Sequence, residues 1–400
     1  MKRVQRTPVA LSIWLVLGCG TSVLHAQDAT EPAAEAPTAP PAEQPVLRLL
    51  AAEVSAERIE ADIRRLVSFG TRHTLSDTLS DTRGIGAARR WIKAELDLIS
   101  GDCGGCLEVF YQRTLVEAGD RIPEPVEIVN VVAIQRGEHD PDRYVIISGD
   151  IDSRVSDPLD AVSDSPGAND NASGVAGVLE GARVLTGHRF SGSIVYAALS
   201  GEEQGLYGGR HLAALAAERG WRVSGVLNND MIGNVEGITG VVDNTSARVF
   251  SEGTRAVETE REARMRRFTG GEVDSPSRNL ARYVKRMADL YFTDLDVMMI
   301  YRLDRFGRGG HHRPFNDAGF AAVRIMETNE NYRRQHQDLR TEDGVEYGDV
   351  IEGVDFDYAA RLTGLNVVVL AAIAWAPPSP RDVLIRGAVS PNTTLSWEPV

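Results

Sequence analysis

The chain has 400 residues, 42% of them hydrophobic, which is enough to build one large domain or two ordinary ones. It carries 43 basic and 57 acidic side chains, for a formal charge of −14. This excess of negative charge argues against nucleic acid as a partner, because the phosphate backbone attracts basic surfaces.

The N-terminus has the pattern of an export signal. Basic residues precede an apolar run from Val9 to Leu17 that is too short to span a bilayer. We expect residues 1–26 to be a signal peptide, which makes the protein periplasmic or secreted and leaves no transmembrane span after cleavage. The stretch ending in Cys19 also resembles a lipobox, so lipid anchoring through Cys19 is the alternative.

Residues 27–46 are rich in Ala, Pro and Glu and predict a disordered linker. From residue 47 to residue 378, apolar runs alternate with helical patterns, which predicts a single catalytic domain. The runs are Ile128–Ile134, Tyr144–Ile147, Ile194–Leu199, Val223–Leu227 and Phe320–Ile325. Continuous apolar strands separated by helices predict an α/β fold with a mixed, mostly parallel sheet covered by helices on both faces.

Several helices are expected between and after these strands. Apolar residues recur at helical spacing in Ala172–Leu185 and Tyr207–Ala217, and Thr363–Trp375 is expected to be a closing buried helix. Residues 247–310 interrupt the alternation of strands and helices. They form either an insertion that covers the active site or a solvent-exposed surface insertion. Residues 379–400 resemble the first two strands of a fibronectin type III domain, so we expect the natural chain to continue beyond Val400.

Cys103 and Cys106 are the two cysteines outside the signal segment. In an exported chain this spacing predicts a structural disulfide that closes a tight turn.

Carboxylates follow successive strands where those strands end, and another precedes a helix. They are Asp150 and Asp152, Glu202 and Glu203, Asp230, and Asp170. In open α/β sheets, ligands bind beyond the carboxyl ends of the strands. Converging carboxylates repel one another unless cations compensate, so the pattern predicts a metal site.

The segments Gly167–Gly174 (GANDNASG) and Ser200–Gly205 (SGEEQG) resemble those of the co-catalytic metallopeptidases of clan MH. That family contains bacterial leucyl aminopeptidases, glutamate carboxypeptidases and glutaminyl cyclases, and the resemblance covers roughly residues 55–378. It implies two divalent metal ions, zinc first, bridged by Asp170. It further implies Asp230 as a ligand at the first ion, and Glu203 and His312 at the second.

The resemblance also implies roles around the ions. Glu202 would act as general base on a metal-activated water, and Asp152 would orient a ligand. The family's usual His-X-Asp is here Asp150-Ile151-Asp152, so Asp150 stands where a first-site histidine is expected. A carboxylate at that position favours Mn²⁺ or Co²⁺ alongside Zn²⁺. His311 could stabilise an oxyanion, compensate for the missing imidazole, or lie idle.

The resemblance favours an exported aminopeptidase that acts on peptides. A carboxypeptidase, or a peptidase selective for acidic residues, is the alternative because arginines occur throughout Arg302–Arg313. A non-catalytic binding protein on the same fold is a rival of another class. His336 and Asp338 resemble a downstream family segment, but the sequence assigns them no role, and it does not indicate the oligomeric state.

Overall fold

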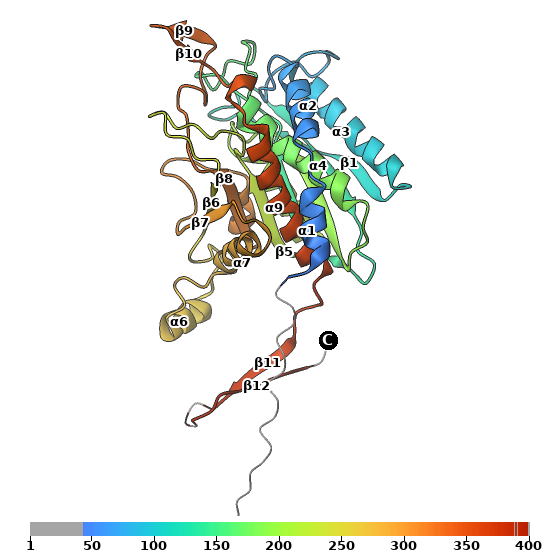
Figure 1. Cartoon of the computed structure of the whole chain (residues 1–400), viewed down its shortest axis with the longest axis vertical. Helices are drawn as coiled ribbons and strands as arrows, with labels where there is room; N and C mark the ends of the chain where they lie inside the picture. The colour runs from blue at the N-terminus through green and yellow to red at the C-terminus, as the bar shows by residue number, and fades with distance from the viewer. Residues whose placement is uncertain (1–42, 388, 390, 399–400) are drawn as a thin grey trace, which may run out of the picture. The chain divides into compact units, whose positions relative to one another are not determined.

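An eight-stranded sheet organises the part of the chain that the computed structural model describes, which is residues 43–387, 389 and 391–398 (Figure 1). The strand order is β1-β2-β4-β3-β5-β8-β6-β7. The strands are β1 (Leu107–Val116), β2 (Val126–Gln135), β3 (Asp140–Asp150), β4 (Gly192–Leu199), β5 (Arg222–Asn229), β6 (Ser246–Ser251), β7 (Asp296–Ile300) and β8 (Ala322–Glu327).

The centre of the sheet is parallel. Strands β4, β3, β5 and β8 run in the same direction, whereas β1, β2 and β6 pair antiparallel with their inner neighbours. Every residue of β4 is buried, as expected for a parallel strand covered on both faces. The mixed, mostly parallel α/β sheet that the sequence predicts is therefore confirmed.

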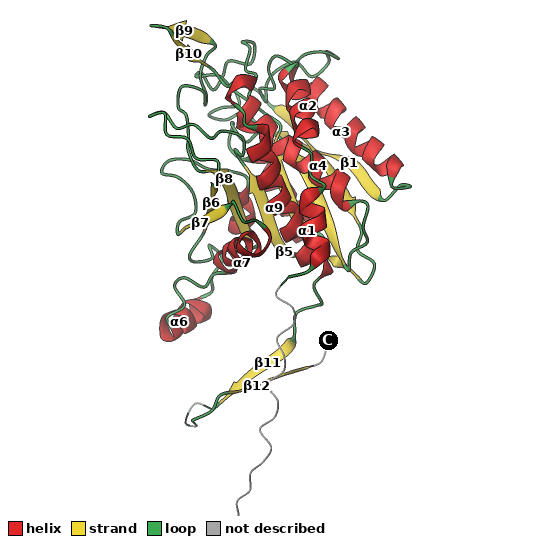
Figure 2. Cartoon of the chain, in the orientation of Figure 1, coloured by secondary structure: helices red, strands yellow, loops and turns green. Residues whose placement is uncertain are grey.

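Helices cover both faces of the sheet (Figure 2). The main core packs one face against α1 (Pro45–Ala52), α2 (Ala56–Val67), α3 (Gly84–Asp102), α4 (Gly174–Leu185), α7 (Pro276–Tyr291) and α9 (Phe356–Trp375). A smaller core packs the other face against α5 (Tyr207–Glu218) and α8 (His312–Asp317). The remaining elements are α6 (Glu260–Thr269), the short helical turns Ala168–Ser173 and Ile351–Gly353, and the hairpin of β9 (Arg340–Glu342) with β10 (Val345–Tyr347).

Two regions differ from the sequence expectation. Residues 247–310, expected as an interruption, supply most of β6 and all of β7 to the sheet. Helix α1 begins at Pro45, where the linker was expected to end at residue 46. The predicted signal peptide with Cys19, and most of the linker at 27–46, lie outside the described residues.

Helix α9 is the central element of the main core. Within the described residues it is also the one helix long and apolar enough to cross a membrane, but 72% of its most apolar window is buried inside the fold. It begins at Phe356, seven residues before the expected start at Thr363, because the Asp355 side chain caps it by accepting from the N–H of Tyr358 at 2.8 Å.

Two small elements lie outside the central sheet. A disulfide joins Cys103 and Cys106 at the turn that follows α3. Near the C-terminus, β11 (Arg381–Arg386) pairs antiparallel with β12 (Thr394–Glu398), and all described residues of both strands are exposed. The resemblance of this tail to a fibronectin type III domain stays a prediction.

The burial of α9 leads to a stability prediction. Leu365 in α9 is fully buried, so Leu365→Ala should lower the free energy of unfolding by about 2–5 kcal/mol through lost burial and a residual cavity. Leu98→Ala is the matched control in α3, because Leu98 is 62% exposed and should cost less than about 0.5 kcal/mol. Urea denaturation measures both, and equal losses would contradict the central place of α9 in the core.

Candidate active site

The parallel strands bring the acidic residues to one edge of the sheet. Strand β3 ends at Asp150, β4 leads into Glu202 and Glu203, and β5 leads into Asp230. Because β4, β3 and β5 are adjacent and parallel, these exits lie side by side among the loops at the carboxyl edge (Figure 2). Asp170 joins them from the turn that precedes α4.

Three side chains form a compact cluster at this edge. Asp170, Glu203 and His336 each offer a ligand atom, and these atoms all lie within 4.8 Å of one another. Nε2 of His336 lies 2.7 Å from Glu203 Oε1 and 3.0 Å from Asp170 Oδ2, yet this buried nitrogen makes no well-directed hydrogen bond. Zinc binds histidine nitrogen and carboxylate oxygen, and its catalytic sites have three protein ligands, so the three side chains of this cluster fit a zinc ion.

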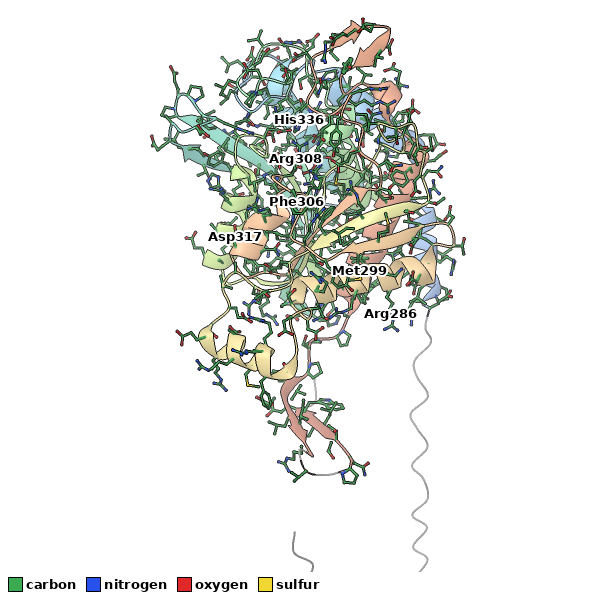
Figure 3. All side chains as sticks on the ribbon, turned by 90° about the vertical axis from the view of Figure 1, so that its left-hand side faces the viewer. Arg286, Met299, Phe306, Arg308, Asp317 and His336 are labelled. Carbon is green, nitrogen blue, oxygen red and sulfur yellow. A yellow bond between two sulfur atoms is a disulfide. The ribbon has the colours of Figure 1, made fainter. Side chains whose placement is uncertain are left out.

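Two neighbouring carboxylates determine the pKa of His336. Burial alone would lower its pKa, but the Glu203 and Asp170 carboxylates raise it to about 9. On the other side of the ring, Arg154 Nη2 lies 2.7 Å from Nδ1. Arg308 Nη1 lies 3.4 Å from the same nitrogen, and Figure 3 labels both Arg308 and His336. A cation bound at Nε2 would displace the proton held there and leave the one proton of the neutral ring on Nδ1, so the Arg154 guanidinium would have to draw back from Nδ1.

Two further carboxylates, Asp152 and Asp349, accept hydrogen bonds from the backbone of residues at the cluster. Asp152 accepts from the backbone N–H groups of Glu202 at 3.2 Å and Glu203 at 3.0 Å, and this fixes the exit from β4. Asp349 accepts from the backbone N–H of Asp170 at 2.6 Å. Asp152 thus positions the two glutamates through their backbone, a role close to the orienting one expected for it.

Glu202 points into the cleft with its carboxylate free. In the described part of the chain, no hydrogen bond or ion pair engages this carboxylate, and Arg154 binds its neighbour Glu203 instead. Burial and then the nearby charges of Glu203 and Asp230 raise the pKa of Glu202 well above its usual range. A half-buried, unpaired carboxylate with a raised pKa beside side chains that could hold a metal ion is suited to taking and returning a proton.

The structure places His312 elsewhere than the resemblance implied. Its Nε2 lies 2.8 Å from the carbonyl oxygen of Leu303 and 3.6 Å from Asp304, and it is fully buried at the start of α8. Burial lowers its pKa to about 4, so it is neutral at pH 7. His336, to which the sequence assigned no role, is the imidazole that meets Asp170 and Glu203.

Asp150 and Asp230 lie beside the cluster but are bound to other residues. Asp150 contacts His311 Nδ1 and accepts from Asn171 Nδ2 at 2.7 Å. Asp230 Oδ1 pairs with Arg324 Nη2 at 2.8 Å. His311 is fully buried behind the strand ends and does not line the cleft, so an oxyanion role has no geometric support.

A cleft of about 700 Å³ opens over the cluster and is markedly charged. Its lining includes six arginines, namely Arg121, Arg154, Arg210, Arg305, Arg308 and Arg313. Larger apolar side chains contribute little, with Leu206 and Leu303 among the few. The cleft therefore suits a polar or charged ligand.

The sequence analysis assigned no role to three residues that the structure places at the site, and two of them carried a signal in the sequence. The segment containing His336 follows β8, so it leaves the carboxyl edge of the sheet like the segments that carry Glu203 and Asp230. Arg324 interrupts the apolar run Phe320–Ile325, and an arginine inside a buried strand needs a buried partner. Asp349 had no local signal, because its partners Asn169 and Asp170 are distant in the sequence.

A carboxylate–imidazole cluster at the strand ends of an α/β sheet, with a free carboxylate beside it, is typical of metal-dependent hydrolases. Residues 130–350 match peptidase family M28. A probable zinc metalloprotease of Leptosphaeria maculans is 47% identical over 358 residues, covering 89% of this chain and 83% of that protein. A second probable zinc metalloprotease, from Pyricularia oryzae, is 45% identical over 349 residues, covering 86% of this chain and 70% of that protein. The chain belongs to peptidase family M28.

Solved structures agree on the fold. The LapA aminopeptidase of Legionella pneumophila superposes with a TM-score of 0.59 at 19% identity, covering 84% of this chain and 76% of LapA. A glutaminyl cyclase of Macrostomum lignano superposes with a TM-score of 0.57 at 15% identity, covering 83% and 94%. At these identities the likeness extends to the fold and leaves the reaction open.

The different positions of the two histidines lead to a metal-binding prediction. His336→Ala should abolish zinc retention, because it removes one of three donors from the cluster. His312→Ala is the matched control and should retain zinc, since His312 bonds to Leu303 instead. Zinc content after dialysis, measured by plasma mass spectrometry on folded protein, distinguishes the two, and the reverse pattern would restore His312 as the ligand.

Proposed function

We propose that the chain is a zinc-dependent exopeptidase that removes residues from the N-terminus of peptides, with Glu202 as its general base. The carrying observation is the free Glu202 carboxylate beside the cluster of Asp170, Glu203 and His336. The family, the names of the relatives and the aminopeptidases among the structural neighbours support this assignment.

The residues of the site have separate roles in the proposed reaction. Asp170, Glu203 and His336 would hold zinc, which supplies Lewis-acid polarisation of a carbonyl and lowers the pKa of water. The Glu202 carboxylate accepts a proton from the attacking water and returns it to the departing amine. Asp152 holds Glu202 and Glu203 at the strand exit, so that one carboxylate faces the cleft and the other the cluster.

The protein is proposed to be exported. The leader-like residues 1–26 support this, and so does the disulfide between Cys103 and Cys106, since such bonds persist in oxidising compartments.

Glu202 provides the first test of the reaction. Glu202→Gln keeps the shape of the side chain but removes the base, so turnover should fall by at least about 100-fold while zinc content and fold stay unchanged. Glu218→Gln, at the exposed end of α5, is the matched control and should keep full activity. Unchanged turnover in zinc-loaded Glu202→Gln protein would exclude this residue as the base. An absence of peptidase activity in the zinc-loaded wild type, on broad peptide panels, would favour the non-catalytic binding protein.

A second candidate, attack from the C-terminus or at acidic residues, is favoured by the arginines of the cleft. Arg308 and Arg313 line it, and neither has a carboxylate partner among the described residues. Arg305, in contrast, is paired with Glu330. Unpaired guanidinium groups near the cluster could bind a substrate carboxylate.

Blocked peptides distinguish the two ends of the substrate. An aminopeptidase should cut peptides with a free amine, tolerate C-terminal amidation and ignore N-acetylated peptides. Cleavage of acetylated peptides together with loss of cleavage on amidation would reverse this and identify a carboxypeptidase. In that case Arg308→Ala or Arg313→Ala should raise KM about tenfold, as expected for one charged hydrogen bond. Arg302→Ala, which lies outside the cleft lining, should not.

A further inference from the structure

At the expected position of a second metal ion, the carboxylates Asp150 and Asp230 are bound by other side chains of the same chain. The family resemblance places that ion between Asp150, Asp170 and Asp230. Asp170 belongs to the cluster with His336, but the other two carboxylates are each engaged by buried groups. The number of ions that this chain binds is therefore a question separate from the reaction that it catalyses.

Asp150 uses both of its carboxylate oxygens within the fold. Oδ1 contacts Nδ1 of His311, and Oδ2 accepts from the Asn171 side chain at 2.7 Å. The His311 ring has little freedom to withdraw, because Gly209 leaves no space on its far side. A Cβ atom built at Gly209 would come within 2.6 Å of the His311 ring. This fixed imidazole keeps Asp150 turned toward a protein partner.

Asp230 is bound on two sides by one buried cation. Arg324 Nη2 lies 2.8 Å from Asp230 Oδ1, and Arg324 Nε donates to the Asp230 backbone carbonyl. The same guanidinium is held from behind, since Nη1 lies 3.0 Å from Asp304 Oδ2 and also donates to the Gly309 carbonyl. With donors used on both sides and no exposure, the arginine is locked in place.

A fixed positive charge at this distance changes what Asp230 can bind. It offsets the carboxylate charge that would attract a dication, and it repels any dication that approaches. In addition, Asp150 stands where the family resemblance expects a histidine, and its two oxygens are already engaged by the Asn171 side chain and the His311 imidazole. Among the described residues, Asp170, Glu203 and His336 are the one group of three metal-binding side chains that converge.

We infer that this chain binds one metal ion, at Asp170, Glu203 and His336, and that the Arg324 guanidinium takes the place of a second cation beside Asp230. Arg324 acts as a positioning residue, since it lies behind Asp230 and does not line the cleft. The inference concerns the metal count and holds for either direction of peptide attack.

Metal counting tests the inference directly. Wild-type protein, Asp150→Asn and His336→Ala are saturated with zinc, dialysed, and analysed by plasma mass spectrometry and native mass spectrometry. One, one and no ions per chain are expected. Two ions in the wild type would overturn the inference, and loss of one of them in Asp150→Asn would identify Asp150 as a ligand.

Variants of Arg324 test the replacing cation. Arg324→Met removes the charge at similar length, so in millimolar Mn²⁺ the protein should bind a second ion. Arg324→Lys keeps the charge and should remain at one ion. Circular dichroism checks that each variant is folded. A folded Arg324→Met protein that still binds one ion would overturn the role of Arg324, and the wild-type count decides the stoichiometry even if that variant unfolds.

Discussion

Negative charge buried at the carboxyl edge of the sheet is the constraint on which the rest of the site depends. Five acidic side chains reach this edge with little or no exposure, namely Asp150, Asp152, Asp170, Glu203 and Asp230. A buried carboxylate is stable only when donors or cations surround it. The neighbouring structure supplies them through backbone N–H groups at Asp152, an imidazole at Asp150 and a guanidinium at Asp230. Glu202 stands out because it has no such partner.

The sequence predicted those parts of the molecule that follow from local pattern. The central strands are continuous apolar runs, and a parallel sheet places their ends together, so Glu202, Glu203 and Asp230 could be assigned to one edge. Strands β1, β6 and β7 were not predicted. Strands β1 and β7 lie at the sheet edges and are only partly buried, and the short interior strand β6 begins with Ser246 and carries Arg248 among its apolar residues. Edge strands lack the unbroken apolar signal of central ones.

Which histidine joins Asp170 and Glu203 could not be chosen from pattern alone. His312 sits at a helix start with a family-like neighbourhood, whereas His336 lies in an irregular loop whose path is set by distant contacts. One such contact joins Asp349 to the backbone of Asn169 and Asp170. The strand pattern indicates that Arg324 is buried and needs a partner, but it does not indicate that this partner is Asp230.

His336 lies far toward the C-terminus from Asp170 and Glu203, so it is synthesised after them. Asp170 and Glu203 leave the ribosome well before the loop that carries the imidazole and the Asp349 anchor. Until that loop has docked, the nascent domain holds an incomplete set of donors, and two carboxylates alone bind zinc weakly. Capture of a zinc ion by this cluster would therefore wait until β8 and the loop after it have been made. A chain that travels unfolded to another compartment would acquire its ion at the destination.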